Sequence, residues 1–451
     1  MIRNWLTAHG YTLPGADFFS QIDRWRAWYQ GFVPAFHRYW VHNGQKRRRC
    51  ERYRLNMARS VCAEHAKLLL NDRVRISCGD FRELDALLAE ADFFTQGNRL
   101  IELAFALGTG AFTEYKGADG RPCIDYVRGD MIFPLKWRGQ TITDCAFGSR
   151  VTVGGRQGWY IQLHEKQGGQ YILRNVYLDA DGKETAPPEG IAPRVETGSS
   201  APLFQLIRPA RVNNVDLDCP LGAAIYSDAI DQLKGCDFAY DSFVNEIQLG
   251  RARLMVPQSM ATIEMQKSGL VEPRFDPNDA TFYVYEQSSD GKQDLKHVIP
   301  PLRMAEHEKG VQMALDMLSF KSDLGKGRFR FEGGTIKTAR EVIAQNSDLY
   351  QSIKRNEKVI ESAIFDMVRA LGFLTGLNAE KLTPVVAFDE SIFEDAEAIA
   401  SQNVMLVNAG LRTRKDAIMA IEQVDESVAL KKAEAIAKEQ NFPAPTTFME
   451  D

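Results

Sequence analysis

The sequence predicts an α+β fold, because strand patterns and helix patterns occupy different parts of the chain. Short runs of alternating polarity, separated by Gly, Asp and Asn turns, fill residues 110–206. A long helical pattern without Pro or Gly follows Thr338 and continues to Leu371. The chain has 451 residues, 44% of them hydrophobic, so it can bury a large core in roughly two to four domains.

Aromatic side chains are concentrated in residues 1–45. Trp5, Trp25, Trp28 and Trp40 are four of the six tryptophans of the chain. Aromatic residues bury large areas, so this region is interpreted as a packing segment or a subunit interface. An amphipathic helix lying on a membrane surface is the alternative.

A basic segment follows at residues 46–54, and we expect it to be helical and to lead into a helix that contains Met57 and Leu69. Its six cations fit either a solvated helix start or a phosphate contact.

Strands and turns then dominate as far as residue 206. The alternation predicts antiparallel strands in a meander or a small barrel. The predicted strands lie at residues 123–127, 141–147, 159–163 and 171–178.

The second half of the chain returns to helical patterns, with smaller strand-like regions between them. Helices are predicted at residues 222–249, 302–324 and 395–438, and the pattern at residues 251–301 is mixed and strand-like. One further strand is predicted at residues 384–388.

The most informative segment is a glycine-rich basic connector at residues 325–337, between two helical patterns. The next helix begins with a capping box, in which Thr338 and Glu341 satisfy each other's free backbone N–H groups. That helix is expected to be about 50 Å long at 1.5 Å per residue. A long strut beside a cationic loop indicates a mechanical part that faces a polyanion, and a core helix with a solvated connector is the alternative.

Sequence motifs for catalysis are largely missing. The chain has no Walker A pattern, no G-x-S-x-G elbow and no H-x-x-x-H pair. Two acidic pairs, Asp216 with Asp218 and Asp276 with Asp279, fit either a divalent-metal site or ordinary turns. We therefore expect no catalytic residues, no cofactor and no metal.

Cysteine usage and hydropathy indicate the setting. The seven cysteines form no CxxC pair, which favours reduced thiols in a cytosolic setting. The N-terminus carries no secretion signal, and no apolar stretch approaches 18 residues, so no membrane segment is expected. The net charge of −5 excludes a chain whose whole surface binds nucleic acid.

Several short segments, in this order and at these spacings, resemble the portal proteins of long-tailed bacteriophages, the head-to-tail connectors. The resemblance covers nearly the whole chain, and it is short of the family pattern at the C-terminal end. It rests on WRAWYQG (residues 25–31), LNMA (55–58), NNVD (213–216), DFAYDSF (237–243), TAREVI (338–343) and FDESI (388–392).

This resemblance implies a portal-type ring subunit with a β-rich wing, a two-helix stem, a small clip, a long spine helix and a helical crown. The implied parts are the wing (residues 1–215), the first stem helix (216–250), the clip (251–301), the second stem helix (302–324), the tunnel loop (325–337), the spine helix (338–375), and a wing strand with crown and C-terminal helices (376–451).

The resemblance also implies function and partners. A ring, expected to be a dodecamer, would form in the host cytoplasm, sit at the capsid vertex of the virion, and conduct double-stranded DNA during packaging and ejection. Terminase, a head–tail adaptor, and the major capsid or scaffold protein would be its partners. In the tunnel loop, Lys326, Arg328, Arg330 and Lys337 would contact DNA phosphates, and Gly325, Gly327, Gly333 and Gly334 would give the loop its freedom.

Two other interpretations remain open from the residues. One is a phage nucleic-acid enzyme with a carboxylate metal site. The other is a non-catalytic cytosolic scaffold that binds proteins through its Trp-rich N-terminus.

Overall fold

The structure is a computed structural model of the whole chain. It describes residues 1–42, 47–117, 119–153, 155–188, 190–250, 252–257, 282–285, 296–330, 339–389, 403–422 and 426–440.

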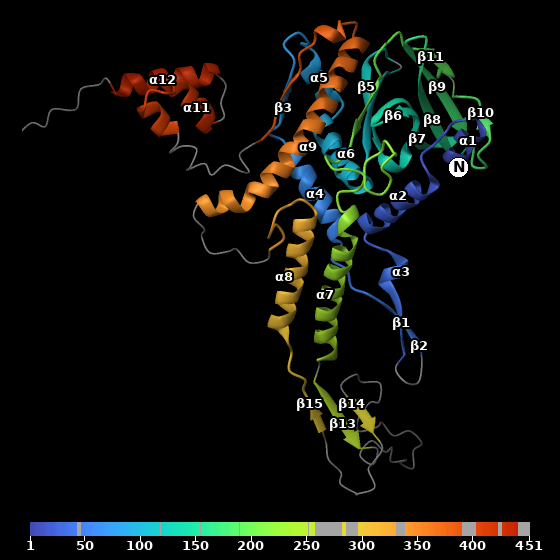
Figure 1. Ribbon diagram of the computed structural model, residues 1–451, viewed down its shortest axis with the longest axis vertical. Helices are drawn as coiled ribbons and strands as arrows, with labels where there is room; N and C mark the ends of the chain where they lie inside the picture. Colours follow the sequence, from blue (N-terminus) through green and yellow to red (C-terminus); the bar gives the residue numbers. More distant parts are fainter. Residues whose placement is uncertain are drawn as a thin grey trace, which may run out of the picture.

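Helices and strands combine in one body from which a pair of helices projects (Figure 1). The α+β prediction is confirmed. A hydrophobic core joins the body's sheets to its helices, and all seven cysteines are free. The helices of the body are α1 (Ile2–Ala8), α2 (Ala16–Tyr29), α3 (Pro34–His37), α4 (Met57–Leu69), α5 (Leu84–Glu90), α6 (Phe93–Leu107) and α9 (Ala339–Leu374).

The N-terminal tryptophans are mostly part of this core. Trp5, Trp25 and Trp28 are buried, so the packing interpretation is confirmed for these three. Trp25 packs edge-on against Phe18 with ring centres 5.9 Å apart. Trp40, in contrast, is 56% exposed.

The expected antiparallel meander is present. One sheet has the order β10-β9-β8-β7-β6, with β11 also paired to β9, and a second has the order β12-β4-β5. All pairings within these two sheets are antiparallel. The strands are β4 (Gly110–Lys116), β5 (Pro122–Arg128), β6 (Ile132–Arg138), β7 (Thr141–Val153), β8 (Arg156–Gln167), β9 (Gln170–Leu178), β10 (Glu184–Thr185), β11 (Arg194–Glu196) and β12 (Phe204–Ile207).

A close backbone approach ties the sheets to the segment that leads into the projecting helices. Gly108, at φ 85°, ends α6, and a Cβ there would lie 2.2 Å from the carbonyl oxygen of Gly222. The Gly222 N–H donates to the Thr109 hydroxyl at 3.0 Å. Only glycine tolerates both the left-handed backbone and the missing space at position 108.

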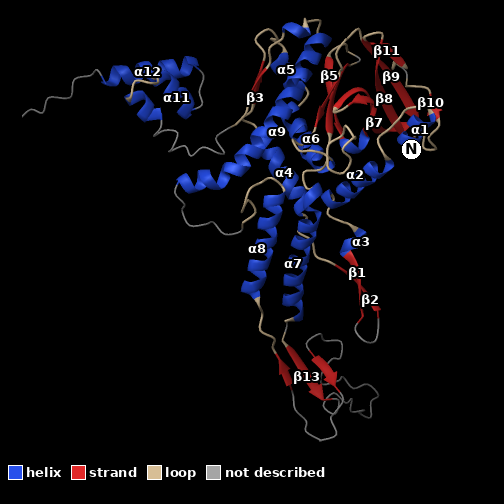
Figure 2. Ribbon diagram, in the orientation of Figure 1, coloured by secondary structure: helices blue, strands red, loops and turns tan. Residues whose placement is uncertain are grey.

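The projecting pair consists of α7 (Ile230–Leu249) and α8 (Met304–Lys321), which run in opposite directions side by side. At their far end lies a small sheet of order β14-β13-β15, from β13 (Arg253–Pro257), β14 (Phe282–Tyr285) and β15 (Lys296–Val298) (Figure 2). The predicted start of the first helix, near residue 222, was wrong. In residues 213–222 the Asn213 side chain accepts from the Val215 N–H and donates to the Leu221 carbonyl, which holds this segment in turns. Helix α7 therefore starts only at Ile230.

The basic segment at residues 46–54 was predicted to be helical, and this was wrong for its described part. Strand β1 (Arg38–His42) pairs antiparallel with β2 (Arg47–Glu51) in a two-stranded hairpin. Asn43-Gly44, a dipeptide typical of hairpin turns, stands between the two strands in the sequence. That signal outweighs the helix propensity of the arginines.

The long helix after the basic connector is present as α9, with 36 residues and therefore a length of about 54 Å. Leu349, Ile353, Ile360 and Ile364 are buried along one side, as the periodicity predicts. The capping-box residue Thr338 lies outside the described residues. The predicted strand at residues 384–388 is β16 (Val385–Ala387), which pairs with β3 (Arg75–Ser77), and helices α11 (Arg414–Glu422) and α12 (Glu426–Gln440) follow.

Replacing Ile353 with Asp tests the buried face of α9. Ile353 is 0% exposed, so the carboxylate would be buried without a partner, and we expect a loss of at least about 3 kcal/mol of unfolding free energy. Lys358→Asp, at an exposed position of the same helix, is the matched control and should cost under about 1 kcal/mol. Urea unfolding measures both, and equal stability of the two variants would contradict a buried strut.

Candidate nucleic-acid interface

Helix α8 ends where the backbone enters the left-handed region. Asp323 has φ 61°, Gly325 φ 71° and Gly327 φ 77°. The Ser322 hydroxyl donates to the Leu318 carbonyl at 2.6 Å, which satisfies one of the free acceptors at the helix end. These dihedral angles turn the chain back along α8.

The basic loop, residues 325–330, consequently lies against the last turns of α8. The Arg328 N–H donates to the Ser319 hydroxyl at 3.3 Å, and the Gln312 amide donates to the Phe329 carbonyl at 3.1 Å. The Phe329 ring is half-buried against the core. Gly327, at φ 77°, has the left-handed backbone that favours glycine, whereas the nearest atoms to a Cβ there belong to the flexible end of the Arg330 side chain.

The three described cations of the loop have different surroundings. Arg328 donates through Nε to Oε1 of Glu64 on α4 at 2.9 Å, and its Nη2 bonds to the same oxygen. Arg330 lies 3.4 Å from the Asp316 carboxylate on α8. Lys326 is exposed, and its ammonium lies 5.9 Å from the ring centre of Phe320.

The structure therefore gathers Lys326, Arg328 and Arg330 on one short segment and provides carboxylates for two of them. Lys337, Gly333 and Gly334 lie outside the described residues. Sequence reasoning missed both carboxylates. No local signal reveals Glu64, because it is 264 residues from Arg328 along the chain.

A buried histidine fastens the end of α8 to α4. His65 is fully buried, and its Nε2 lies 2.8 Å from the Ser322 carbonyl oxygen, so Nε2 carries the proton and donates. Burial lowers the pKa of His65 to about 4, which keeps the ring neutral near pH 7. The start of the basic loop is thus held by a neutral hydrogen bond beside the Arg328–Glu64 ion pair.

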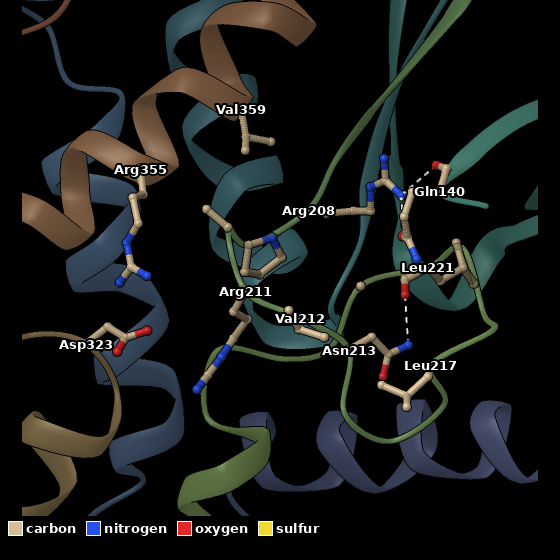
Figure 3. A pocket seen from close by; sticks show the side chains of 13 residues that line it. Gln140, Arg208, Arg211, Val212, Asn213, Leu217, Leu221, Asp323, Arg355 and Val359 are labelled. Atoms are coloured by element: carbon tan, nitrogen blue, oxygen red, sulfur yellow. Dashed lines mark hydrogen bonds between the residues drawn. The ribbon is translucent and has the colours of Figure 1, made fainter.

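A pocket of about 670 Å³ adjoins the start of the basic loop (Figure 3). Arg355 of α9 and Asp323 line one side, and Arg208 and Arg211 come from the segment after β12. Arg208 is committed to the fold, because its guanidinium donates to the carbonyls of Gln140 at 3.1 Å and Pro220 at 2.6 Å. Burial lowers the pKa of Arg208 from its ordinary value.

Arg211 is also paired, with the Asp228 carboxylate at 3.1 Å, whereas Arg355 is exposed. Sequence reasoning singled out none of these three arginines. Only the neighbouring NNVD segment at residues 213–216 pointed to this region.

Acidic side chains show no metal-binding arrangement in the described ranges. Asp216 accepts a hydrogen bond from the backbone N–H of Asp218 at 3.1 Å, as in an ordinary Asx turn. Asp276 and Asp279 lie outside the described residues. In the ranges that are described, no three His, Cys, Asp or Glu side chains gather closely enough to hold a metal ion.

Among the residues that the structure describes, no helix is both long enough and apolar enough to cross a membrane.

The described residues thus contain a helix pair that carries a small sheet, a basic loop after the second helix of the pair, and the long helix α9. The family model "Phage portal protein, SPP1 Gp6-like" matches residues 15–442, nearly the whole chain. The chain belongs to this phage portal family. It is therefore a virion protein, a portal at the capsid vertex and the connector between head and tail. The DNA channel and the docking roles in packaging and ejection are implied by that membership, and the family is in general structural and non-catalytic.

Two solved structures are similar to this portal chain at low identity. A chain from the virion of a native gene transfer agent particle shares 12% identity, with 93% of this chain and 98% of that chain covered and a TM-score of 0.45. A chain from the neck of a native gene transfer agent particle, computed with C12 symmetry, shares 13% identity over 80% and 89% of the two chains, with a TM-score of 0.39. No curated protein sequence matches the portal chain.

The buried His65 predicts a pH dependence of stability. Its folded-state pKa of about 4 lies below the ordinary 6.5, so the unfolded chain binds more protons between these values. The stabilisation is complete above about pH 6.5 and is lost as the pH falls towards 4. We expect the melting temperature to drop over this range.

His65→Gln should reduce that slope, because glutamine can donate to the Ser322 carbonyl without titrating. His297→Gln, at an exposed histidine, is the control and should leave the slope unchanged. If the melting temperatures of wild type and His65→Gln fell equally between pH 7 and 4.5, the pH dependence would not come from His65.

Proposed function

We propose that the chain forms a closed ring of twelve copies around a channel for double-stranded DNA, and that it acts as a non-catalytic conduit. The single observation that carries this is the match of residues 15–442 to the phage portal family. Ring closure needs two different, complementary surfaces on each copy, as in any heterologous assembly.

The parts of the proposed ring subunit follow the elements. The wing comprises residues 1–215, the stem residues 216–250 and 302–324, with α7 and α8 as its helices, and the spine residues 338–375, with α9. Residues 325–337 form the tunnel loop, and residues 376–451 supply a wing strand and the crown. The arrangement that supports this division is the helix pair that leaves the body and carries a separate small sheet (Figure 1).

The clip, residues 251–301, is the proposed docking site for terminase and later for the head–tail adaptor. Its strands β13, β14 and β15 lie at the end of the molecule farthest from the body (Figure 2). A surface held away from the body by two helices can be contacted by successive partners without disturbing the core. The body in turn would contact the major capsid or scaffold protein.

Phosphate contact in the channel is proposed for the tunnel loop, residues 325–337, whose described part is the basic loop. Lys326 and Arg330 are exposed and are the foremost candidates, with Lys337 as a further one. Arg328 is tied to Glu64, so its contact with a phosphate would require that ion pair to open. A ring of such loops would touch the DNA backbone without reading its sequence, which suits a channel for any genome.

The first test is the mass of the purified chain. We expect light scattering to give a mass of about a dozen copies, because the proposed interfaces close on themselves. A ring with one copy more or fewer would still fit, since closure depends on the rotation between neighbours. A stable monomer at micromolar concentration over a range of salt concentrations would contradict the proposal.

The second test concerns the basic loop. Replacing Lys326, Arg328 and Arg330 together with Ala should leave ring assembly intact and reduce DNA packaging or retention. Single changes should be mild, because a ring offers redundant contacts and salt screens each exposed charge.

The ion pair with Glu64 calls for two further variants. Lys326→Ala with Arg330→Ala should reproduce the DNA effect, while Arg328→Ala alone should chiefly lower the melting temperature, because it leaves Glu64 without its partner. Lys116→Ala with Arg156→Ala removes two exposed cations of the wing and is the matched control. If the triple variant packaged DNA as well as the wild type, these cations would be ordinary solvated surface charges and the proposed phosphate contact would be wrong.

A further inference from the structure

Helix α7 holds the β1–β2 hairpin through two carboxylates on one of its faces. Asp237 accepts from the backbone N–H of Leu55 at 2.8 Å, and Asp241, one turn later, accepts from that of Tyr53 at 2.9 Å. The other oxygen of Asp237 lies 3.0 Å from Nε2 of the buried His37. These bonds fix the segments just before and just after the hairpin, and they explain two polar residues of the DFAYDSF motif.

The opposite face of α7 holds α8. Glu246 follows Asp237 by nine residues, which is about two and a half turns, so it points to the other side of the helix. Its carboxylate accepts from Nη2 of Arg303 at 2.7 Å and from Nε at 3.0 Å. The hairpin, α7 and α8 therefore form a row with α7 in the middle (Figure 1).

One end of the row is the outer face of the hairpin. Tyr39 faces inward, because the Arg52 guanidinium lies 4.5 Å from its ring centre and 5.5 Å from that of Phe238 on α7. Neighbouring residues of a strand point to opposite faces, so Trp40 faces outward, and it is 56% exposed. Arg47 lies 4.7 Å from the Trp40 ring centre, and Arg49 is the cross-strand partner of Trp40.

The other end of the row is an exposed face of α8. Met313, Met317 and Phe320 are 60%, 53% and 53% exposed, and their spacing of four and three residues places them in one stripe. The exposed Glu306 and Gly310 continue the stripe towards the helix start. The stripe is turned away from the buried side of α8, which is formed by Val311, Leu315 and Leu318.

We propose that the hairpin of one copy docks on this α8 stripe of the next copy in the ring. The inference rests on the proposed ring assembly and names one of its contacts. Trp40 would pack on Gly310 and Met313, and the neighbouring arginines would meet Glu306. A second copy is the occupant because the two surfaces lie at opposite ends of one row, as head-to-tail closure requires.

The chemistry of the two surfaces is complementary. Tryptophan and arginine carry much of the binding energy in protein interfaces, and methionine thioethers make favourable contacts with aromatic rings. The outer face of the hairpin offers Trp40 between exposed cations, and the stripe offers two methionines, a phenylalanine and a carboxylate. In the part of the chain that the structure describes, Trp40, Met313 and Met317 are all more than half exposed, and Phe320 at the end of the stripe has the Lys326 ammonium 5.9 Å from its ring centre.

A site-specific cross-link tests the contact in the full chain. With Trp40→p-benzoylphenylalanine, illumination of assembled rings should give a ladder of multimers, with the cross-link in the α8 peptide of a second copy. The same photoreactive residue at the exposed Val195 on β11 is the control and should not reach that peptide. Rings in which position 40 cross-links only within its own copy, to another segment, or not at all would overturn the inference.

Charge substitutions test the same contact by assembly. Trp40→Asp and Met313→Asp should each raise the concentration needed for half-maximal assembly at least tenfold, while Met405→Asp, at a methionine 71% exposed on another part of the chain, should not. An equimolar mixture of the first two variants should form dimers, because one hairpin and one stripe remain intact. Circular dichroism checks that each variant is folded.

The outcomes distinguish a failure of the proposed ring assembly from a failure of the proposed hairpin contact. A wild-type chain that stays monomeric would defeat ring assembly itself. Wild-type rings together with unchanged assembly of both Asp variants would defeat only the hairpin contact. Normal rings of Trp40→Asp that fail to join capsids would assign the hairpin to a capsid partner instead, and would also overturn the inference.

Discussion

The attachment of the end of α8 to α4 is the contact on which the arrangement of the molecule depends. Glu64 and His65 are adjacent residues, and they bind the Arg328 guanidinium and the Ser322 carbonyl. One bond is ionic and half-buried, and the other is neutral and fully buried. Together they fix the point at which the stem, the basic loop and the body meet.

This attachment also determines what the basic loop presents. Because the backbone reverses at Asp323, Gly325 and Gly327, the loop lies on α8, and Arg328 points into the body. The cations that remain exposed, Lys326 and Arg330, are at the surface of a fixed segment. A few exposed charges on a chain of net charge −5 suit a channel, since each tightly held phosphate adds affinity and would hinder the movement of DNA.

The second organising element is α7, which binds a different neighbour on each face. Carboxylates do this on both sides, because Asp237 and Asp241 bind backbone N–H groups and Glu246 binds a guanidinium. On α7 itself Phe238 and Ile247 remain 56% and 41% exposed. Further exposed apolar and aromatic side chains lie on the outer members of the row, Trp40 on the hairpin and Met313 and Met317 on α8.

The sequence by itself determined the elements whose signals are local. Alternation predicted the meander strands, the apolar periodicity predicted α9, and the order of short motifs identified the portal family before any contact was known. The β1–β2 hairpin was missed, although its Asn43-Gly44 signal was also local, and the start of α7 was placed too early. Tertiary structure alone decided the partners of the basic loop and the row around α7. Pairs such as Arg328 with Glu64 join residues 264 positions apart, and a single sequence has no periodicity that records which distant charges meet when the core closes.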